Sequence, residues 1–187
     1  MATSQLSYTT VATAIGEVCI WWSGIEALAH GVALRLAILN EPNLYRQNAR
    51  TQLNLALSNM DQRELFATTK ALAFHGSPED LYPRMESILN NIDNVLRLER
   101  NRFVHDSWFA SGAAAQRTQR GTKVVKVQSR QKALSLNPTT QYYSLAEIDA
   151  LAGKLKLAYV ELEKIDKEII HRLDERTHQP GWLEQHE

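Results

Sequence analysis

Three polar side chains near the middle of the chain, Arg100, Asn101 and His105, have the types and spacing suited to cleaving RNA without a metal ion. In such a reaction, the 2′-hydroxyl of the substrate attacks the neighbouring phosphate. A histidine that titrates near neutral pH takes or gives the proton. An arginine neutralises the charge that builds up on the phosphate oxygens, and an asparagine orients either partner. We therefore take these three residues as the candidate catalytic set.

The charges around this set favour an anionic ligand. The chain has 187 residues, and its 21 basic and 21 acidic side chains give a formal net charge of zero. Residues 97–132, however, hold nine basic and two acidic side chains, so the positive excess lies in this stretch. An anionic ligand is drawn there first. Within it, we expect Arg102, Lys123 and Lys126 to bind the phosphate backbone of RNA.

The helix that carries the set is predicted to have two apolar faces. Its core face consists of Met85, Ile88, Leu89, Ile92, Val95, Leu96 and Phe103. At 100° per residue, Asn101 and His105 share a face turned away from that core. Leu98, Val104 and Trp108 share this outward face, and a second apolar face normally has a second partner. We expect a two-fold homodimer that brings two copies of the set together.

Four stretches of helical period must position these residues. They are 11–40, 48–75, 77–106 and 144–169. In the second stretch, the candidates for burial are Leu53, Ala56, Leu57, Met60, Leu65, Leu72 and Ala73.

Local signals mark the ends of these helices. Glu41-Pro42 ends the first, and Asp61 with Glu64 can cap a restart within the second, which Gly76 ends. Ser77-Pro78-Glu79-Asp80 is a start signal for the third, and Ser144 with Glu147 forms a capping box for the last.

Between the last two helical stretches the period changes to strand-like alternation. Residues 122–129 alternate, so the basic segment 107–143 is predicted to form a small β-hairpin or arm. The predicted fold is all-α: a four- to five-helix up-down bundle with this small β-hairpin or arm inserted before the last long helix. We expect residues 1–187 to form a single domain.

The run Arg100-Asn101-Arg102-Phe103-Val104-His105 resembles the R-x4-H motif, in its R-N-x-x-x-H form, of the HEPN superfamily. HEPN domains are small, all-helical and typically dimeric, and many are metal-independent endoribonucleases of toxin–antitoxin, abortive-infection and CRISPR systems. The resemblance implies that Arg100 and His105 are the catalytic pair, with Asn101 beside it. It also implies RNA as substrate, an antitoxin protein as a further partner, and no cofactor or metal.

Two positions qualify the resemblance. Ser107 stands where some HEPN proteins have a tyrosine that antitoxin enzymes modify, which puts that mode of neutralisation in doubt. Family members also often use a polar residue from the first helix. Glu26 is the candidate here, with a surface or capping role as the alternative.

Other interpretations stay open at this point. The chain is alternatively a non-catalytic HEPN-like helical module that binds a nucleotide, RNA or a protein partner, with Arg100 paired to an acid and His105 capping the helix. Glu168 and His171 match the Glu-x-x-His step of di-iron bundles. No second such step exists in the sequence, and His171 points away from the apolar face of its helix, so we interpret this pair as a solvated face.

The remaining composition favours a cytoplasmic protein. Cys19 is the only cysteine, which excludes an intrachain disulfide and a cysteine zinc site and fits a reducing compartment. Glu17, Glu26 and His30 interrupt the first apolar stretch before it reaches the roughly 20 residues of a membrane span. We therefore expect no membrane partner.

Overall fold

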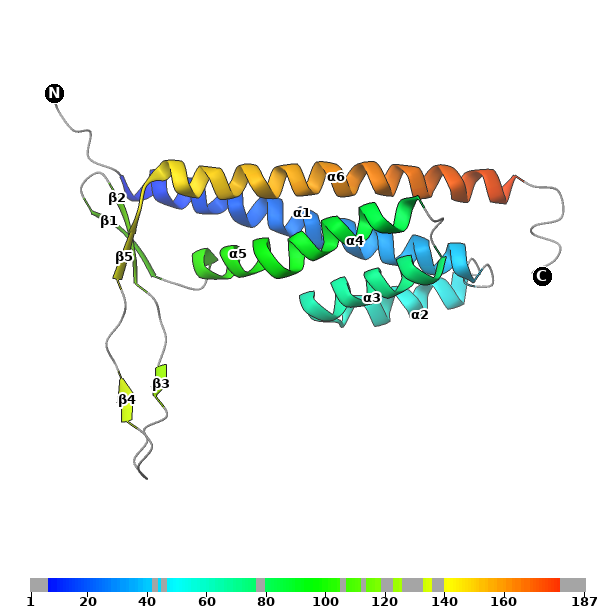
Figure 1. The fold of residues 1–187 in the computed structure, drawn as a ribbon, viewed down its shortest axis with the longest axis horizontal. Coiled ribbons are helices and arrows are strands. Elements are labelled where there is room, and N and C mark those ends of the chain that lie inside the picture. Colours follow the sequence, from blue (N-terminus) through cyan, green and yellow to red (C-terminus); the bar gives the residue numbers. More distant parts are fainter. Residues whose placement is uncertain are drawn as a thin grey trace. The chain divides into compact units, whose positions relative to one another are not determined.

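Apolar residues recur at helical spacing in four stretches of the chain, and helices make up most of its computed structural model (Figure 1). The structure describes residues 7–41, 44, 47–76, 80–104, 107–111, 114–118, 123–125, 133–135 and 140–178. The helices are α1 (Tyr8–Asn40), α2 (Gln47–Ser58), α3 (Gln62–Gly76), α4 (Leu81–Asn91), the π-helical turn η2 (Ile92–Leu96), α5 (Arg97–Val104) and α6 (Leu145–Thr177). Because α4, η2 and α5 follow one another directly, these elements form five helical rods in the described chain. The predicted helical bundle of four to five helices is confirmed.

Several predicted helix ends are confirmed by local contacts. α1 ends at Asn40, just before Glu41-Pro42. A restart does divide the second stretch into α2 and α3, since the Glu64 amide donates to Asp61 Oδ1 (2.9 Å) and the Asp61 amide donates to Glu64 Oε2 (3.1 Å). α3 ends at Gly76, where a Cβ atom would lie 1.2 Å from Asn40 Oδ1. A larger residue at this position would require the exposed Asn40 side chain to move.

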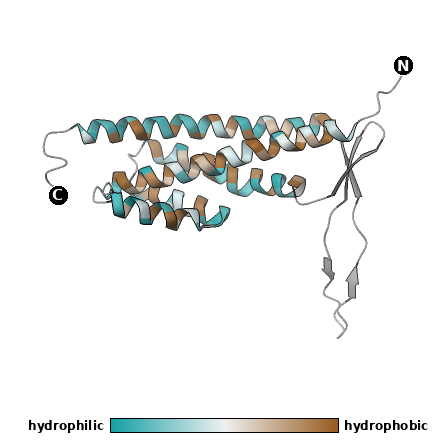
Figure 2. Cartoon of the chain, turned by 180° about the vertical axis from the view of Figure 1, so that it is seen from behind, coloured by the Kyte–Doolittle hydropathy of each residue, from teal (hydrophilic) through white to brown (hydrophobic). Residues whose placement is uncertain are grey.

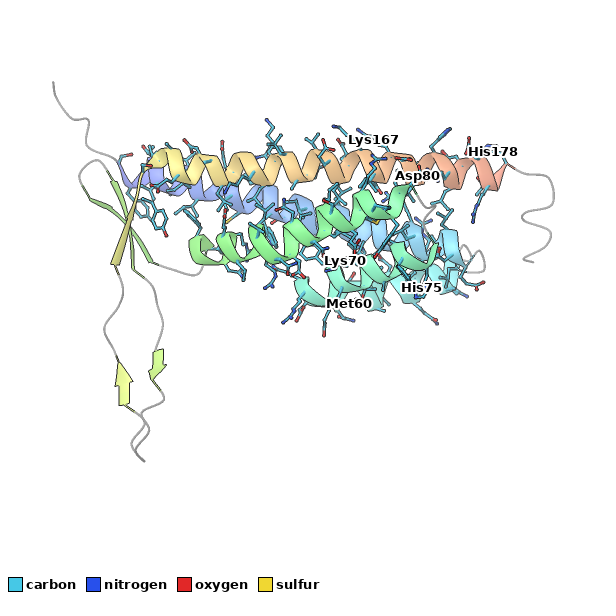
Figure 3. The ribbon with its side chains drawn as sticks, viewed as in Figure 1. Met60, Lys70, His75, Asp80, Lys167 and His178 are labelled. Carbon is cyan, nitrogen blue, oxygen red and sulfur yellow. The ribbon has the colours of Figure 1, made fainter. Side chains whose placement is uncertain are left out.

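The start of α4 differs from its prediction. The helix begins at Leu81, with Asp80 in the N-cap position, rather than at the Ser77 signal. The Asp80 side chain makes no capping hydrogen bond. The Asp80 carboxylate instead accepts a hydrogen bond from Arg172 Nη2 of α6 at 3.1 Å, and so forms an ion pair between two helices (Asp80 is labelled in Figure 3). Residues 77–79 lie outside the described residues.

The chain divides into two compact units, and α1 and α6 contribute to both. One unit comprises Met1–Ile20 and Leu98–Gly153, and the other comprises Trp21–Arg97 and Lys154–Glu187.

In the second unit, the helices alternate in direction around a shared core. Three contacts show that α1 and α6 run parallel: the rings of Trp21 and Tyr159, the ion pair of Arg35 and Asp166, and the hydrogen bond from Arg176 to the Leu39 carbonyl. Ion pairs of Asp80 with Arg172 and of Arg84 with Glu168 show that α4 runs antiparallel to α6. The largest fully buried side chains of this unit include Trp22, Ile25, Leu36, Leu57, Phe66, Leu81, Met85, Leu89, Ile92, Leu96 and Leu155.

The first unit joins the beginnings of α1 and α6 to α5 and a group of strands. Its buried apolar residues are Val11, Ala14, Val18, Phe103, Ile148, Leu151 and Ala152. Strands β1 (Ser107–Ser111), β2 (Ala114–Thr118) and β5 (Thr140–Tyr143) pair antiparallel in the order β1-β2-β5. Strands β3 (Lys123–Val125) and β4 (Ala133–Ser135) pair separately. The capping box at the start of α6 is confirmed: Ser144 N donates to Glu147 Oε2 at 2.7 Å, and Glu147 N donates to Ser144 Oγ at 3.3 Å.

The π-helical turn changes which residues of the third stretch are buried. The Arg97 amide donates to the Ile92 carbonyl, five residues back, and such a turn holds one residue more than an α-helical turn. Val95, predicted to be buried, is consequently 45% exposed, whereas Asp93 is only 7% exposed. Ile88 is half-buried, and Met85, Leu89, Ile92, Leu96 and Phe103 are buried as predicted.

Burial in α2 and α3 also differs in part from the prediction. Leu57, Leu65 and Ala73 are buried, but Ala56 is exposed. Phe66 and Thr69 are fully buried, and neither belongs to the predicted set. Leu53, Met60 and Leu72 are half-buried.

α1 is long and apolar enough, by length and composition, to cross a membrane. The charged residues Glu17 and Glu26 still leave an 18-residue window that meets these criteria. The core helix of a soluble protein meets the same criteria. The last turns of α6 are mostly hydrophilic in Figure 2.

Candidate functional site

The described part of the R-N-x-x-x-H motif, residues 100–104, lies on α5. Arg100 and Asn101 are both half-buried, and Arg100 Nη1 donates a hydrogen bond to Asn101 Oδ1 at 3.0 Å. The Arg100 Nε atom is itself buried. An amide oxygen orients a guanidinium group without cancelling its charge. The two side chains thus form a local hydrogen-bonded pair on α5.

The other predicted site residues are described in part or not at all. His105 and Lys126 lie outside the described residues. Arg102 belongs to α5 and Lys123 to β3 by their backbones, and their side chains lie outside the described part of the structure. The structure therefore brings Arg100 and Asn101 together, and the predictions for the other four residues stay predictions.

Phe103, which lies within the motif on α5, makes an aromatic contact. The Phe103 ring lies 5.2 Å from the Tyr143 ring, centroid to centroid, at an interplanar angle of 59°. Phe103 is 7% exposed, as expected for a core residue, and Tyr143 of β5 is half-buried. Such tilted pairs add to the stability that burial alone supplies. Sequence analysis missed Tyr143, because its partner is 40 residues away in the chain.

The proposed outward face of α5 is only partly described. Leu98 is 49% exposed and Val104 is half-buried, while the Trp108 side chain lies outside the described residues. Of this face, Leu98 is therefore the residue that the structure shows exposed.

An ion-pair cluster lies at the π-helical turn that precedes α5. Arg97 Nε donates to Asp93 Oδ1 at 2.8 Å, and Lys70 Nζ of α3 lies 3.6 Å from Asp93 Oδ2 (Lys70 is labelled in Figure 3). Lys70 also donates to Asn90 Oδ1 at 3.3 Å. Asp93 is almost completely buried and is held by two cations. This cluster could not be predicted from the sequence, because residues 92–96 contain no local signal for a π-helical turn.

A hollow of about 480 Å³ lies beside Arg97. Arg63 and Arg97 line it together with Met60, Asp61 and Gln62. Two arginines and one carboxylate give the hollow a mixed but cation-rich lining.

Glu26 and Glu168 have structural contacts of their own. Glu26 Oε1 accepts a hydrogen bond from Trp22 Nε1 at 2.8 Å within α1. Glu168 lies 2.7 Å from Arg172 and 3.0 Å from Arg84, and these hydrogen bonds lower its pKa. His171 is largely exposed, 3.4 Å from Glu175. These contacts give both glutamates a structural role, in which they hold helix residues together.

Metal ligands do not gather in the described residues. No group of three or more His, Cys, Asp or Glu side chains in that part of the chain is arranged to hold a metal ion. Cys19 is half-buried on α1.

Comparisons with known proteins add no relative: no protein-family model, no curated protein and no solved structure matches the chain.

Proposed function

We propose that this protein is a metal-independent endoribonuclease of the HEPN type, acting in a toxin–antitoxin or phage-defence setting. The observation that carries the proposal is the Arg100–Asn101 pair, in which Asn101 Oδ1 orients a half-buried guanidinium group near the end of α5. A partly buried guanidinium group binds a phosphate more strongly than an exposed one, because water screens it less. The largely helical fold also supports the proposal.

The chemistry assigned to these residues is attack of a ribose 2′-hydroxyl on the adjacent phosphate. The bond from phosphorus to the 5′-oxygen of the next nucleotide breaks, which leaves a 2′,3′-cyclic phosphate and a free 5′-hydroxyl. His105 transfers the proton, and Arg100 stabilises the charge on the phosphate oxygens. Asn101 orients Arg100.

Substrate binding is assigned to the basic stretch 97–132, with Arg102, Lys123 and Lys126 on the RNA backbone and the β-hairpin arm carrying the last two. Two copies of the chain supply the complete site as a homodimer, and an antitoxin protein is the expected regulator. The proposed location is the cytoplasm, since a single cysteine fits a reducing compartment.

The test is RNA cleavage by the purified protein in EDTA. Total cellular RNA is the substrate, and the cut ends are analysed for 2′,3′-cyclic phosphate. We expect cleavage by the native protein and a loss of about 100-fold or more in His105→Ala, since positioned acid–base groups contribute that much. Helical content and melting temperature of the variant show whether it is folded.

A control variant separates catalysis from general charge. His171→Ala removes another histidine, one that is exposed on α6, and should leave cleavage unchanged. Equal cleavage by native protein and His105→Ala would point to a contaminating nuclease. No cleavage by a folded native protein would favour the non-catalytic HEPN-like module that binds a nucleotide, RNA or a protein.

A further inference from the structure

An apolar groove runs between the α4–η2 segment and α6, which lie side by side within one unit (Figure 1). It has a volume of about 350 Å³. Its lining includes Ile88, Val95, Leu157 and Ala158, with Lys154 and Glu161 at its edge. Val95 is 45% exposed and Leu157 is 68% exposed. Large apolar side chains left open along a groove are typical of a surface that contacts another protein.

The charges along α6 give this groove a two-fold pattern. Lys154 and Glu161 are seven residues apart, which is close to two helical turns, so they lie on the same side of α6. Leu157 and Ala158 lie midway between them in the sequence. If a two-fold axis between these two apolar residues relates two copies of α6, Lys154 of one copy lies opposite Glu161 of the other.

Two copies of α6 packed antiparallel about that axis would form two identical ion pairs. Lys154 of each copy would face Glu161 of the other, and Leu157 of each copy would enter the groove of the other. Packing in parallel would instead place lysine against lysine and glutamate against glutamate, which is unfavourable. The pattern of charges therefore favours a second copy of the chain in one orientation.

The intrachain contact of Glu161 is compatible with this arrangement. Glu161 pairs with Lys164 on its own helix at 2.5 Å, and both side chains are at least half exposed. A carboxylate has two oxygens and accepts hydrogen bonds from two cations. The partner's Lys154 would thus add a second cation without displacing the first.

We propose that this groove is a self-complementary homodimer interface, formed by antiparallel packing of α6 against α6 of a second copy about an axis between Leu157 and Ala158. This surface on α6 differs from the face of α5, carrying Leu98, on which the sequence predicts the dimer. The inference rests on the groove and its charges, so it stands or falls independently of RNA cleavage.

Charge-reversal variants test the interface, because restored association in a mixture of two opposite variants cannot result from a loss of folding in either one. Lys154→Glu and Glu161→Lys each create two like-charge pairs in the proposed dimer, and each should weaken the self-association constant about tenfold or more. An equimolar mixture of the two variants restores both pairs as opposite charges. We expect the mixture to form a heterodimer that neither variant alone forms as a homodimer, measured by sedimentation equilibrium and native mass spectrometry.

Two further variants complete the design. Leu157→Asp should abolish association, while melting temperature and circular dichroism stay close to those of the native chain, because Leu157 is largely exposed. Lys167→Glu is the matched control: Lys167 is 68% exposed on α6 and lies outside the groove, and it is labelled in Figure 3. Its reversal should leave association unchanged.

The outcomes separate this interface from the ribonuclease. A native protein that is monomeric at high concentration, or a dimer that survives both charge reversals and Leu157→Asp, overturns the interface. RNA cleavage in EDTA, measured on the same samples, decides the proposed function separately. A dimer without cleavage supports the interface and contradicts the ribonuclease. Cleavage by a monomer overturns the interface and contradicts a catalytic site that two copies share.

Discussion

Arg35 of α1 and Asp166 of α6 lie 131 residues apart in the sequence, yet Arg35 Nη1 donates to Asp166 Oδ1 at 2.6 Å. Asp166 is 6% exposed. Removal from water raises the pKa of Asp166 above its ordinary value, and the nearby Arg35 opposes that rise only in part. The ion pair therefore links two parallel helices. Its carboxylate has a raised pKa, so it ionises at a higher pH than an ordinary aspartate does.

The first prediction concerns the pH dependence of this pair. An acid whose pKa is raised on folding contributes stability below its unfolded value, near 3.8, and loses it as pH rises through the raised folded value. The unfolding free energy of Asp166→Asn, relative to the native chain, should therefore improve as pH rises through this window. Urea unfolding of both proteins from pH 3 to 7 measures the difference. A difference that is constant with pH would show that Asp166 has an ordinary pKa.

The capping box of α6 should have the opposite pH dependence. Hydrogen bonds from the Ser144 backbone and side chain lower the pKa of Glu147 below 4.5. Its contribution to stability is then present above pH 4.5 and is lost as pH falls through the lowered value. We expect Glu147→Gln to destabilise the protein at pH 7 and to have little effect at pH 2.5. Thermal unfolding at the two pH values tests this, and equal effects at both would contradict it.

Trp22 should be among the most sensitive positions of the core. It is fully buried, its ring meets Phe66 edge-on at 5.9 Å, and its Nε1 donates to Glu26. Trp22→Ala should lower the unfolding free energy by about 4 kcal/mol. Trp21→Ala, on the next residue of the same helix, should cost clearly less, since Trp21 is only half-buried. Similar losses at the two positions in urea unfolding would argue against this packing.

The buried carboxylate at the π-helical turn should also matter for stability. Asp93→Ala leaves Lys70 and Arg97 facing each other without their shared anion, and should cost about 2 kcal/mol. Glu163→Ala, which removes an exposed pair with Lys167, should change stability by less than about 0.5 kcal/mol. Chemical denaturation of the two variants gives the comparison, and a near-neutral Asp93→Ala would refute the structural role of the cluster.

The arginines of the motif should differ in their effect on RNA cleavage. Arg100→Ala removes the guanidinium that Asn101 holds, so it should reduce the cleavage rate more than Arg102→Ala does. Initial rates at saturating RNA, with binding measured separately, distinguish a loss of catalysis from a loss of affinity. Equal losses in both variants would indicate a general charge effect and would contradict the motif assignment.

How much the sequence predicts depends on the range of each interaction. The capping contacts of Asp61 with Glu64 and of Ser144 with Glu147 were predictable, because both partners lie within one helical turn. The same holds for α1, which ends before Pro42. Arg100 and Asn101 are neighbours, so their association was predictable for the same reason.

Longer-range features were not predictable in this way. Val95 continues the apolar period in the sequence, yet it is exposed because the π-helical turn rotates it outward and turns Asp93 inward. Ala56 fits an apolar stripe but is exposed on α2, whereas Phe66, outside the predicted set, is fully buried against Trp22. Each of these outcomes depends on which neighbouring helix packs on which face.

The sequence by itself thus determined the helical class, the main helix boundaries and the motif on α5, since backbone propensity, caps and hydrophobic period act over a few residues. Only the tertiary structure decided the link from Arg35 to Asp166, the burial of Asp93 and the groove at Leu157. These features arise where separate helices meet. The free energy of burying a charge or exposing an apolar side chain depends on neighbours that the local sequence does not specify.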